Sequence, residues 1–151
     1  MKLISLVIIC ILSIPAKSEL LKPTPFIEPE SVVSIQLEAL KQNNLPYKNA
    51  GIAQTWEFAH PINRLNTGPL KKFEKMMYSN SYSMMLNHQY HNIIKVEKKD
   101  NLAFFFIELV DKSDNKFGFQ WILQKISIQG DYFNCWMTIS VSQPTQLAKS
   151  T

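Results

Sequence analysis

Four methionines and two histidines lie within sixteen residues of this chain and could bind a soft metal ion. They are Met76, Met77, Met84, Met85, His88 and His91. Thioether and imidazole groups suit copper(I). However, Met76 and Met77 lie on the apolar side of an expected helix, where methionine is an ordinary core residue. The two histidines would share a face only in a helix, and we expect an extended segment there. The sequence therefore predicts no metal site and no cofactor.

Three other side chains could act as an acid or a base, namely His60, Tyr82 and Glu108. His60 ends an expected helix, where its ring would more simply cap the last carbonyl groups. Glu108 lies in the most apolar segment, and its pKa would rise if it were buried. At an exposed strand end it would be an ordinary solvated carboxylate. We therefore predict no catalytic residue and keep an enzyme that uses these groups as the alternative.

Aromatic and hydrogen-bonding residues gather in the last part of the chain and could form a binding surface. They are Trp121, Tyr132, Asn134, Trp136 and Thr138. Rings supply contact area and polar groups fix the orientation of a ligand. The alternative is a packing surface, such as a homodimer interface across the sheet. The predicted ligand-binding candidates are Trp56, His60, Tyr82, Glu108, Trp121, Asn134 and Trp136.

Composition and charge narrow the function classes. The chain has 151 residues, 46% of them hydrophobic, and a net charge of +4. This is enough for one domain with its own core. No basic run exceeds two residues, so we expect no nucleic-acid partner. The chain also lacks a phosphate-binding glycine loop, a nucleophile elbow and the CxxC and HExxH motifs.

The first residues have the pattern of an export signal. Lys2 precedes an apolar run of twelve residues, Leu3–Ile14, and Ala16 and Ser18 are small residues suited to a cleavage site. The run is shorter than the roughly 20 residues that cross a bilayer. We expect residues 1–18 to be removed, with no membrane span afterwards, and the protein to reach a periplasm, a lumen or the exterior. The remaining cysteine, Cys135, should be buried as a small hydrophobic residue.

One face of an expected helix carries Ile52, Trp56 and Ala59, which follow helical spacing. We therefore expect Trp56 to point toward the strands that follow. His60-Pro61 should end this helix, because the residue before a proline is pushed out of the helical region. Gly68-Pro69 should begin the next one.

The remaining periodicity changes from helical to strand-like along the chain. We expect a linker at 19–28, helices at 29–42, 50–59 and 69–78, strands at 86–96, 102–110, 117–128 and 132–142, and a flexible tail at 143–151. Leu102–Val110 is apolar on both faces apart from Glu108, which is typical of a central strand covered on both sides. The order predicts an α+β domain at 29–142, with three helices on one face of a curved antiparallel sheet of about four strands.

The segments PESVVSIQLEAL, AGIAQTWEFAHP, TGPLKKFEKMMYSNSY and FNCWMTISV resemble the family catalogued as domain of unknown function 4864. The resemblance covers roughly residues 29–142. Such domains are similar to the nuclear-transport-factor-2-like, or cystatin-like, α+β cones. The resemblance implies a fold but no activity, so it assigns no functional residue. We expect a non-catalytic ligand-binding or protein-interaction module, with a small cone-fold enzyme using acid/base chemistry as the alternative.

Overall fold

Helices fill the first half of the described chain and strands the second half. The computed structural model describes residues 19–149, so the predicted export signal lies outside them. The helices are α1 (Pro29–Lys41), α2 (Ala50–Glu57), α3 (Pro61–Thr67) and α4 (Leu70–Met77), followed by the short 3₁₀ turn η1 (Ser83–Met85). The strands are β1 (Tyr90–Lys99), β2 (Leu102–Val110), β3 (Lys116–Lys125), β4 (Trp136–Val141) and β5 (Thr145–Ala148). The α+β prediction is confirmed.

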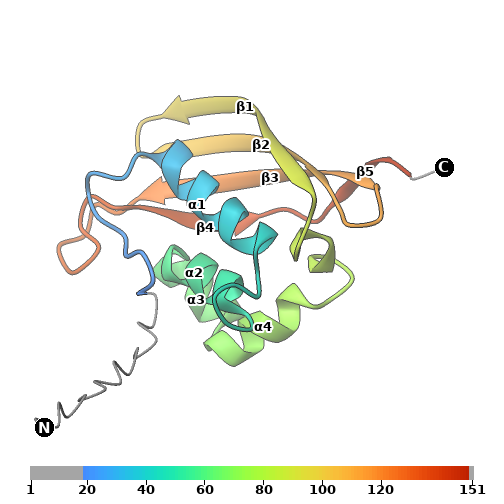
Figure 1. Ribbon diagram of the computed structural model, residues 1–151. Helices are drawn as coiled ribbons and strands as arrows, with labels where there is room; N and C mark the ends of the chain where they lie inside the picture. Colours follow the sequence, from blue (N-terminus) through green and yellow to red (C-terminus); the bar gives the residue numbers. More distant parts are fainter. Residues whose placement is uncertain (1–18, 150–151) are drawn as a thin grey trace, which may run out of the picture.

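All the strands join one open antiparallel sheet in the order β1-β2-β3-β4, and β5 also pairs with β3 (Figure 1). β4 pairs with the second half of β3, at Trp121–Lys125, and β5 pairs with its beginning, at Lys116–Gly118. After Val141 the chain stops pairing with β3, and it pairs with β3 again from Thr145 onward. The predicted flexible tail at 143–151 therefore contains a strand, because the start of β3 offers backbone groups that need a partner.

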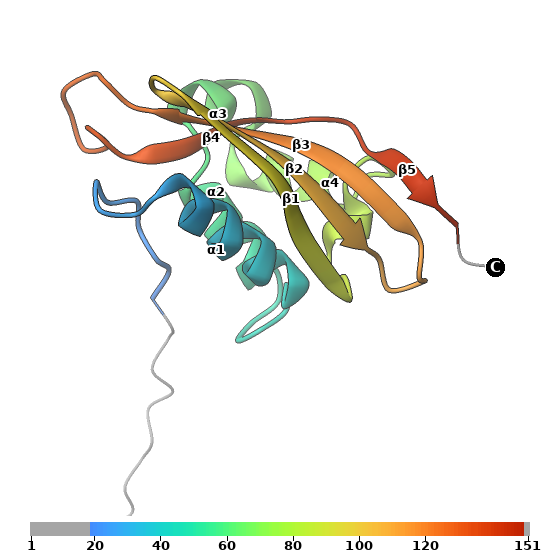
Figure 2. The same ribbon diagram turned by 90° about the horizontal axis from the view of Figure 1, so that it is seen from above.

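The core lies between α1 and one face of the sheet, which we call the inner face (Figure 2). β2 and β3 contribute buried side chains such as Phe105, Ile107 and Trp121, and α1 contributes Leu37 and Leu40. The helices α2, α3 and α4 gather along the β4 edge of the sheet (Figure 1). These apolar residues recur every second position in the strands and every third or fourth position in the helix, as burial on one side requires.

The expectation that β2 is covered on both sides is wrong. Phe104 on its outer face is 37% exposed, and Phe106 and Glu108 are half-buried there. No helix within residues 19–149 packs on this outer face. The apolar outer residues therefore reflect a partly exposed surface and not a second core.

Four α-helices form where the sequence predicts three. The additional helix, α3, begins at Pro61, which occupies its first turn. Proline suits that position because its missing N–H would have no helical partner. α3 has only seven residues and none of them is buried, so no apolar stripe signals it in the sequence.

The last long strand is shorter than predicted and has a different phase. Asn134 adopts a left-handed conformation, with a φ of 63°, and the strand begins only at Trp136. A bulge in the pairing of β3 with β4 leaves Ile139 without a partner. The bulge shifts the alternation by one residue, so Thr138 and Val141 both lie opposite inner-face positions of β3.

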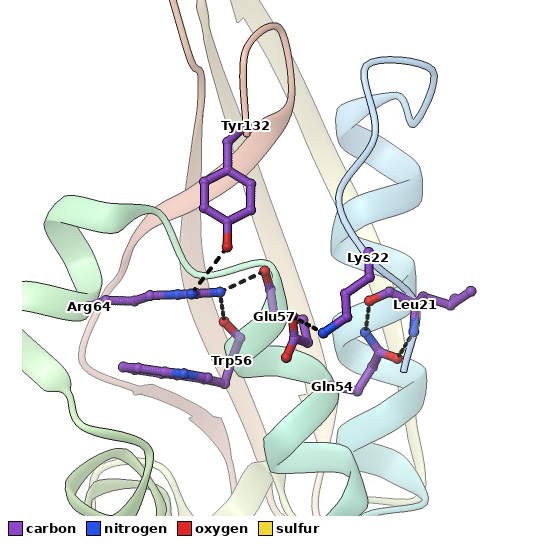
Figure 3. Close-up of polar contacts among 7 residues, drawn as sticks. All are labelled: Leu21, Lys22, Gln54, Trp56, Glu57, Arg64 and Tyr132. Atoms are coloured by element: carbon purple, nitrogen blue, oxygen red, sulfur yellow. Dashed lines mark hydrogen bonds and ion pairs between the residues drawn. The ribbon is translucent and has the colours of Figure 1, made fainter. Parts of the chain in front are cut away.

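The segment 19–28 is irregular, as predicted, but it is fastened to α2 (Figure 3). The Gln54 side chain accepts a hydrogen bond from the backbone of Leu21 at 2.8 Å and donates one back at 2.9 Å. Lys22 forms an ion pair with Glu57 at 2.8 Å. None of the helices in the described part of the chain is long and apolar enough to cross a membrane.

The close crossing of α1 and α2 depends on Gly51. A Cβ atom at this position would overlap the carbonyl group of Ala39 and approach the Cα of Asn43 to 2.8 Å. We predict that Gly51→Ala lowers the free energy of unfolding by roughly 2–3 kcal/mol, measured by urea denaturation, because the helices must move apart. As a control, Ala53→Gly on the same helix should cost about 1 kcal/mol through helix propensity alone. A Gly51→Ala protein as stable as the wild type would contradict this packing.

Candidate functional site

A cavity of about 210 Å³ lies between the helices and the inner face of β4. All four α-helices contribute to its wall, together with Tyr82, Met85 of η1, Trp121 of β3 and the residues 138–141 of β4. The remaining lining residues are Gln36, Leu40, Thr55, Ala59, Asn63, Thr67, Phe73, Met76 and Met77. Among the described residues that form this wall there is no carboxylate, imidazole, ammonium or guanidinium group. Its hydrogen-bonding side chains carry amides, hydroxyls and the indole N–H of Trp121.

A buried amide holds one wall of the cavity together. The Gln36 side chain accepts hydrogen bonds from the indole N–H of Trp121 at 3.1 Å and from the Thr138 hydroxyl at 2.6 Å. Its own N–H donates to the Thr55 carbonyl at 3.1 Å. One side chain of α1 therefore connects α2, β3 and β4. Buried polar groups need such partners, because an unpaired one costs about 1–3 kcal/mol.

Three other polar side chains of the wall are bonded to the backbone. The Tyr82 hydroxyl donates to the Val141 carbonyl at 3.3 Å, and the Asn63 amide donates to the Thr138 carbonyl at 3.2 Å. The Thr67 hydroxyl donates to the Asn63 carbonyl at 2.9 Å. Burial raises the pKa of Tyr82 above that of a free phenol, so the hydroxyl stays neutral at physiological pH. The cavity is therefore polar in places but uncharged.

Trp56, predicted to face the strands, packs at the margin of this site. Its ring lies 5.1 Å from the ring of Phe73, which lines the cavity. The guanidinium of Arg64 covers the Trp56 ring at 5.2 Å (Figure 3). The same guanidinium donates to the carbonyl groups of Trp56 and Glu57, both at 2.9 Å. Arg64 therefore caps the end of α2, where a cation is favourable.

His60 caps the beginning of α3. The expectation that it caps the end of the preceding helix is wrong. Its Nδ1 accepts a hydrogen bond from the backbone N–H of Ile62 at 3.1 Å. Pro61 starts a new helix immediately, so the imidazole meets free N–H groups instead of free carbonyl groups. Burial lowers the pKa of His60, which keeps the accepting nitrogen unprotonated. The ring lines a separate groove beside the loop after β3.

The remaining candidates lie apart from one another. Glu108 is on the outer face and forms an ion pair with Lys116 at 3.4 Å. Asn134 is exposed in the turn before β4. Trp136 is buried in the core, with Lys98 and Lys125 near its ring at 5.8 and 6.0 Å. Of the group predicted as a binding or packing surface, Trp121, Trp136 and Thr138 are buried on the inner side of the sheet, whereas Tyr132 and Asn134 lie in the turn before β4.

The structure does not bring the acid and base candidates together. Tyr82 lines the cavity, His60 lines the separate groove, and Glu108 belongs to neither wall. The outer face also carries exposed apolar residues, including Ile94 and Phe104. A homodimer through this face stays a prediction.

The methionine and histidine cluster divides into two groups. Met76, Met77 and Met85 line the cavity, and Met84 is partly buried against the core. His88 and His91 meet at 2.7 Å, between the Nε2 of His88 and the Nδ1 of His91, although the segment is not helical. The expectation that they do not share a face is wrong, because the chain bends at Gln89 between them and is extended only from Tyr90. Within residues 19–149, no group of three or more His, Cys, Asp or Glu residues is placed to hold a metal ion.

Most of the lining is absent from the predicted candidates, and its polar residues Gln36, Asn63 and Thr67 are among those missed. Gln36 could have been noticed, because it interrupts the apolar stripe of α1 beside Val33, Leu37 and Leu40. A polar residue on a buried stripe indicates an internal hydrogen-bond network. Asn63 and Thr67 lie on the unpredicted α3 and carry no sequence signal.

We predict that Gln36→Met lowers the free energy of unfolding by about 2–3 kcal/mol, because it keeps the side-chain length but removes the buried acceptor shared by Trp121 and Thr138. The Trp121 indole then keeps one partner, the Thr138 hydroxyl at 3.2 Å. Urea denaturation measures the change. Gln54→Met on α2, where the amide bonds an exposed backbone segment, should cost no more than about 1 kcal/mol. Equal costs at Gln36 and Gln54 would contradict a structural role for the buried amide.

Comparisons of this chain with models of known protein families, with curated proteins and with solved structures found no match. The resemblance to the uncharacterised family therefore stays a prediction. The geometry of the cavity is the basis for a function.

Proposed function

We propose that this protein is a non-catalytic binding module that takes up a small, uncharged, mainly apolar molecule in the cavity between its helices and β4. The observation that supports this most is the chemistry of the wall. Apolar side chains such as Phe73, Met77 and Val141 alternate with neutral hydrogen-bonding groups, and Tyr82 is the one titratable residue in the wall. Binding sites commonly combine a mainly apolar lining with a few polar groups that orient the ligand.

The size of the cavity favours a ligand with one or two rings. An apolar protein cavity of about 150 Å³ is large enough for benzene, and this one measures about 210 Å³. The oxygen atoms of Tyr82 and Thr67 donate their protons to the backbone and keep lone pairs free. They suit a ligand that carries a hydroxyl or N–H donor. The three methionines of the wall can adapt to different ring shapes, because their side chains are unbranched and flexible.

The absence of charge from the wall disfavours ionic ligands. A carboxylate in this cavity would lose its hydration without gaining an ion pair, which is costly. Acid/base catalysis needs groups with matched pKa values close to the substrate, and the wall offers a neutral phenol alone. We also propose that the helices and the curved sheet form a cone around the ligand. The protein would bind this ligand after export.

We predict that benzyl alcohol binds to the cavity at pH 7.5 with a dissociation constant of the order of 1 mM, as expected for a ligand of this size. Benzoate, which has the same ring and a negative charge, should bind at least about tenfold more weakly. Chemical-shift titration with ¹³C-methyl-labelled methionine measures both, because Met76, Met77 and Met85 report from the wall.

Two matched variants locate the binding. Val141→Trp should abolish binding of benzyl alcohol, because Val141 lines the cavity and the larger ring would fill it. Val96→Trp places the same ring on β1, away from the wall, and should leave the binding unchanged. Equal binding of benzyl alcohol and benzoate, or equal binding by the two variants, would overturn the proposal.

A further inference from the structure

His88 and His91 belong to a hydrogen-bonded chain that connects η1, β1 and α1. The Nδ1 of His88 lies 2.7 Å from the Met85 carbonyl oxygen. Its Nε2 lies 2.7 Å from the Nδ1 of His91, and the Nε2 of His91 lies 3.4 Å from a carboxylate oxygen of Glu38. His88 is only 3% exposed, whereas the Glu38 side chain reaches solvent.

The partners determine where protons can bind in this chain. A carbonyl oxygen only accepts, so the Nδ1 of His88 carries a hydrogen and donates it to Met85. In neutral His88 the Nε2 then accepts from the Nδ1–H of His91. One added proton can enter at the Nε2 of His91, where it faces Glu38. A second proton would have to enter at the Nε2 of His88, and there it would face the N–H of His91 at 2.7 Å.

Charged neighbours and burial set the pH range of this effect. Burial lowers the pKa of His88 to about 4 and also lowers the pKa of His91. The positive charge of Lys41 lowers both values further, and Glu38 on the same helix opposes it. An opened state, with both rings in water, would bind protons near pH 6.5. The closed arrangement therefore loses stability as the pH falls from about 6.5 to about 4, since the open state binds more protons in this interval.

The chain is connected directly to the wall of the cavity. Met85, whose carbonyl accepts from His88, places its side chain in that wall beside Met77 and Tyr82. The backbone N–H of Asn87 donates to the carbonyl of Leu40, another lining residue, at 2.9 Å. A break between His88 and His91 would remove one of the links between η1 and α1 and weaken the attachment where both elements contribute to the wall, while the bonds of His88 to Met85 and of Asn87 to Leu40 remain.

We propose that protonation of the His88–His91 pair weakens the attachment of η1 to α1 and opens the Met85 side of the cavity, so that the bound neutral molecule leaves at acid pH. The release of a ligand rests on the binding function proposed above. The movement of Met85 does not, and it can be measured in the protein alone.

Three asparagine variants test this gate, because the chain has only three histidines. His88→Asn keeps a donor near the position of Nδ1, for the Met85 carbonyl, and cannot gain a proton. His60→Asn is the matched control, since its side-chain oxygen can still cap α3 and His60 does not contact Met85. In His91→Asn, the amide can turn its oxygen toward a protonated His88, which removes the repulsion between two facing N–H groups.

The experiment follows the ¹³C-methyl resonance of Met85, assigned with Met85→Leu, from pH 8 to pH 4 without ligand. We expect a shift with its midpoint between pH 4 and pH 6.5 in the wild type and in His60→Asn, no shift in His88→Asn and a smaller one in His91→Asn. The affinity for benzyl alcohol, whose charge is constant in this range, should fall about tenfold from pH 7.5 to 4.5 in the wild type.

If the Met85 resonance does not shift with pH in the wild type, or shifts equally in His88→Asn, the proposed opening by protonation is overturned. A Met85 resonance that follows the histidines in a protein that binds benzyl alcohol at no pH would support the gate and overturn the binding function. An affinity that stays constant while Met85 moves would overturn the coupling between them.

Discussion

The arrangement of the helices on the sheet depends on the buried amide of Gln36. It receives hydrogen bonds from β3 and β4 and gives one to α2, so three elements from distant parts of the sequence take their positions from one side chain of α1. Apolar packing alone would allow α1 to slide along the inner face, whereas directional hydrogen bonds specify one register. The cavity lies directly beside this amide. Its shape is therefore a consequence of the same constraint.

Charge is separated from the cavity throughout the structure. Arg64 caps the end of α2 and lies near the rings of Trp56 and Tyr132. Glu108 forms an ion pair with Lys116 on the outer face. The titratable pair of His88 and His91 contacts the cavity wall through the backbone of Met85. A neutral interior with a proton-sensitive support suits reversible binding better than acid/base catalysis.

The sequence predicts the parts of the fold that repeat regularly. The apolar stripe of α1 and the alternation in β3 follow from residue spacing, and the structure agrees. Trp56 packs against the core, with its ring beside Phe73 of α4 and Arg64 of α3. The errors arise where single residues interrupt a period. Pro61 ends one helix and starts another, a bulge at Ile139 changes the face of β4, and a bend at Gln89 lies between the two histidines that meet. The cavity was not predictable in detail, because neutral amides and hydroxyls form no sequence motif.

The most direct test of this account is a crystal structure of the protein at neutral pH with benzyl alcohol diffused into the crystals. We expect the ring to lie in the cavity, in contact with Met77 and Val141, with its hydroxyl directed toward Tyr82 or Thr67. A molecule bound instead on the outer face near Phe104, or in the groove beside His60, would contradict the claim that the uncharged cavity is the binding site.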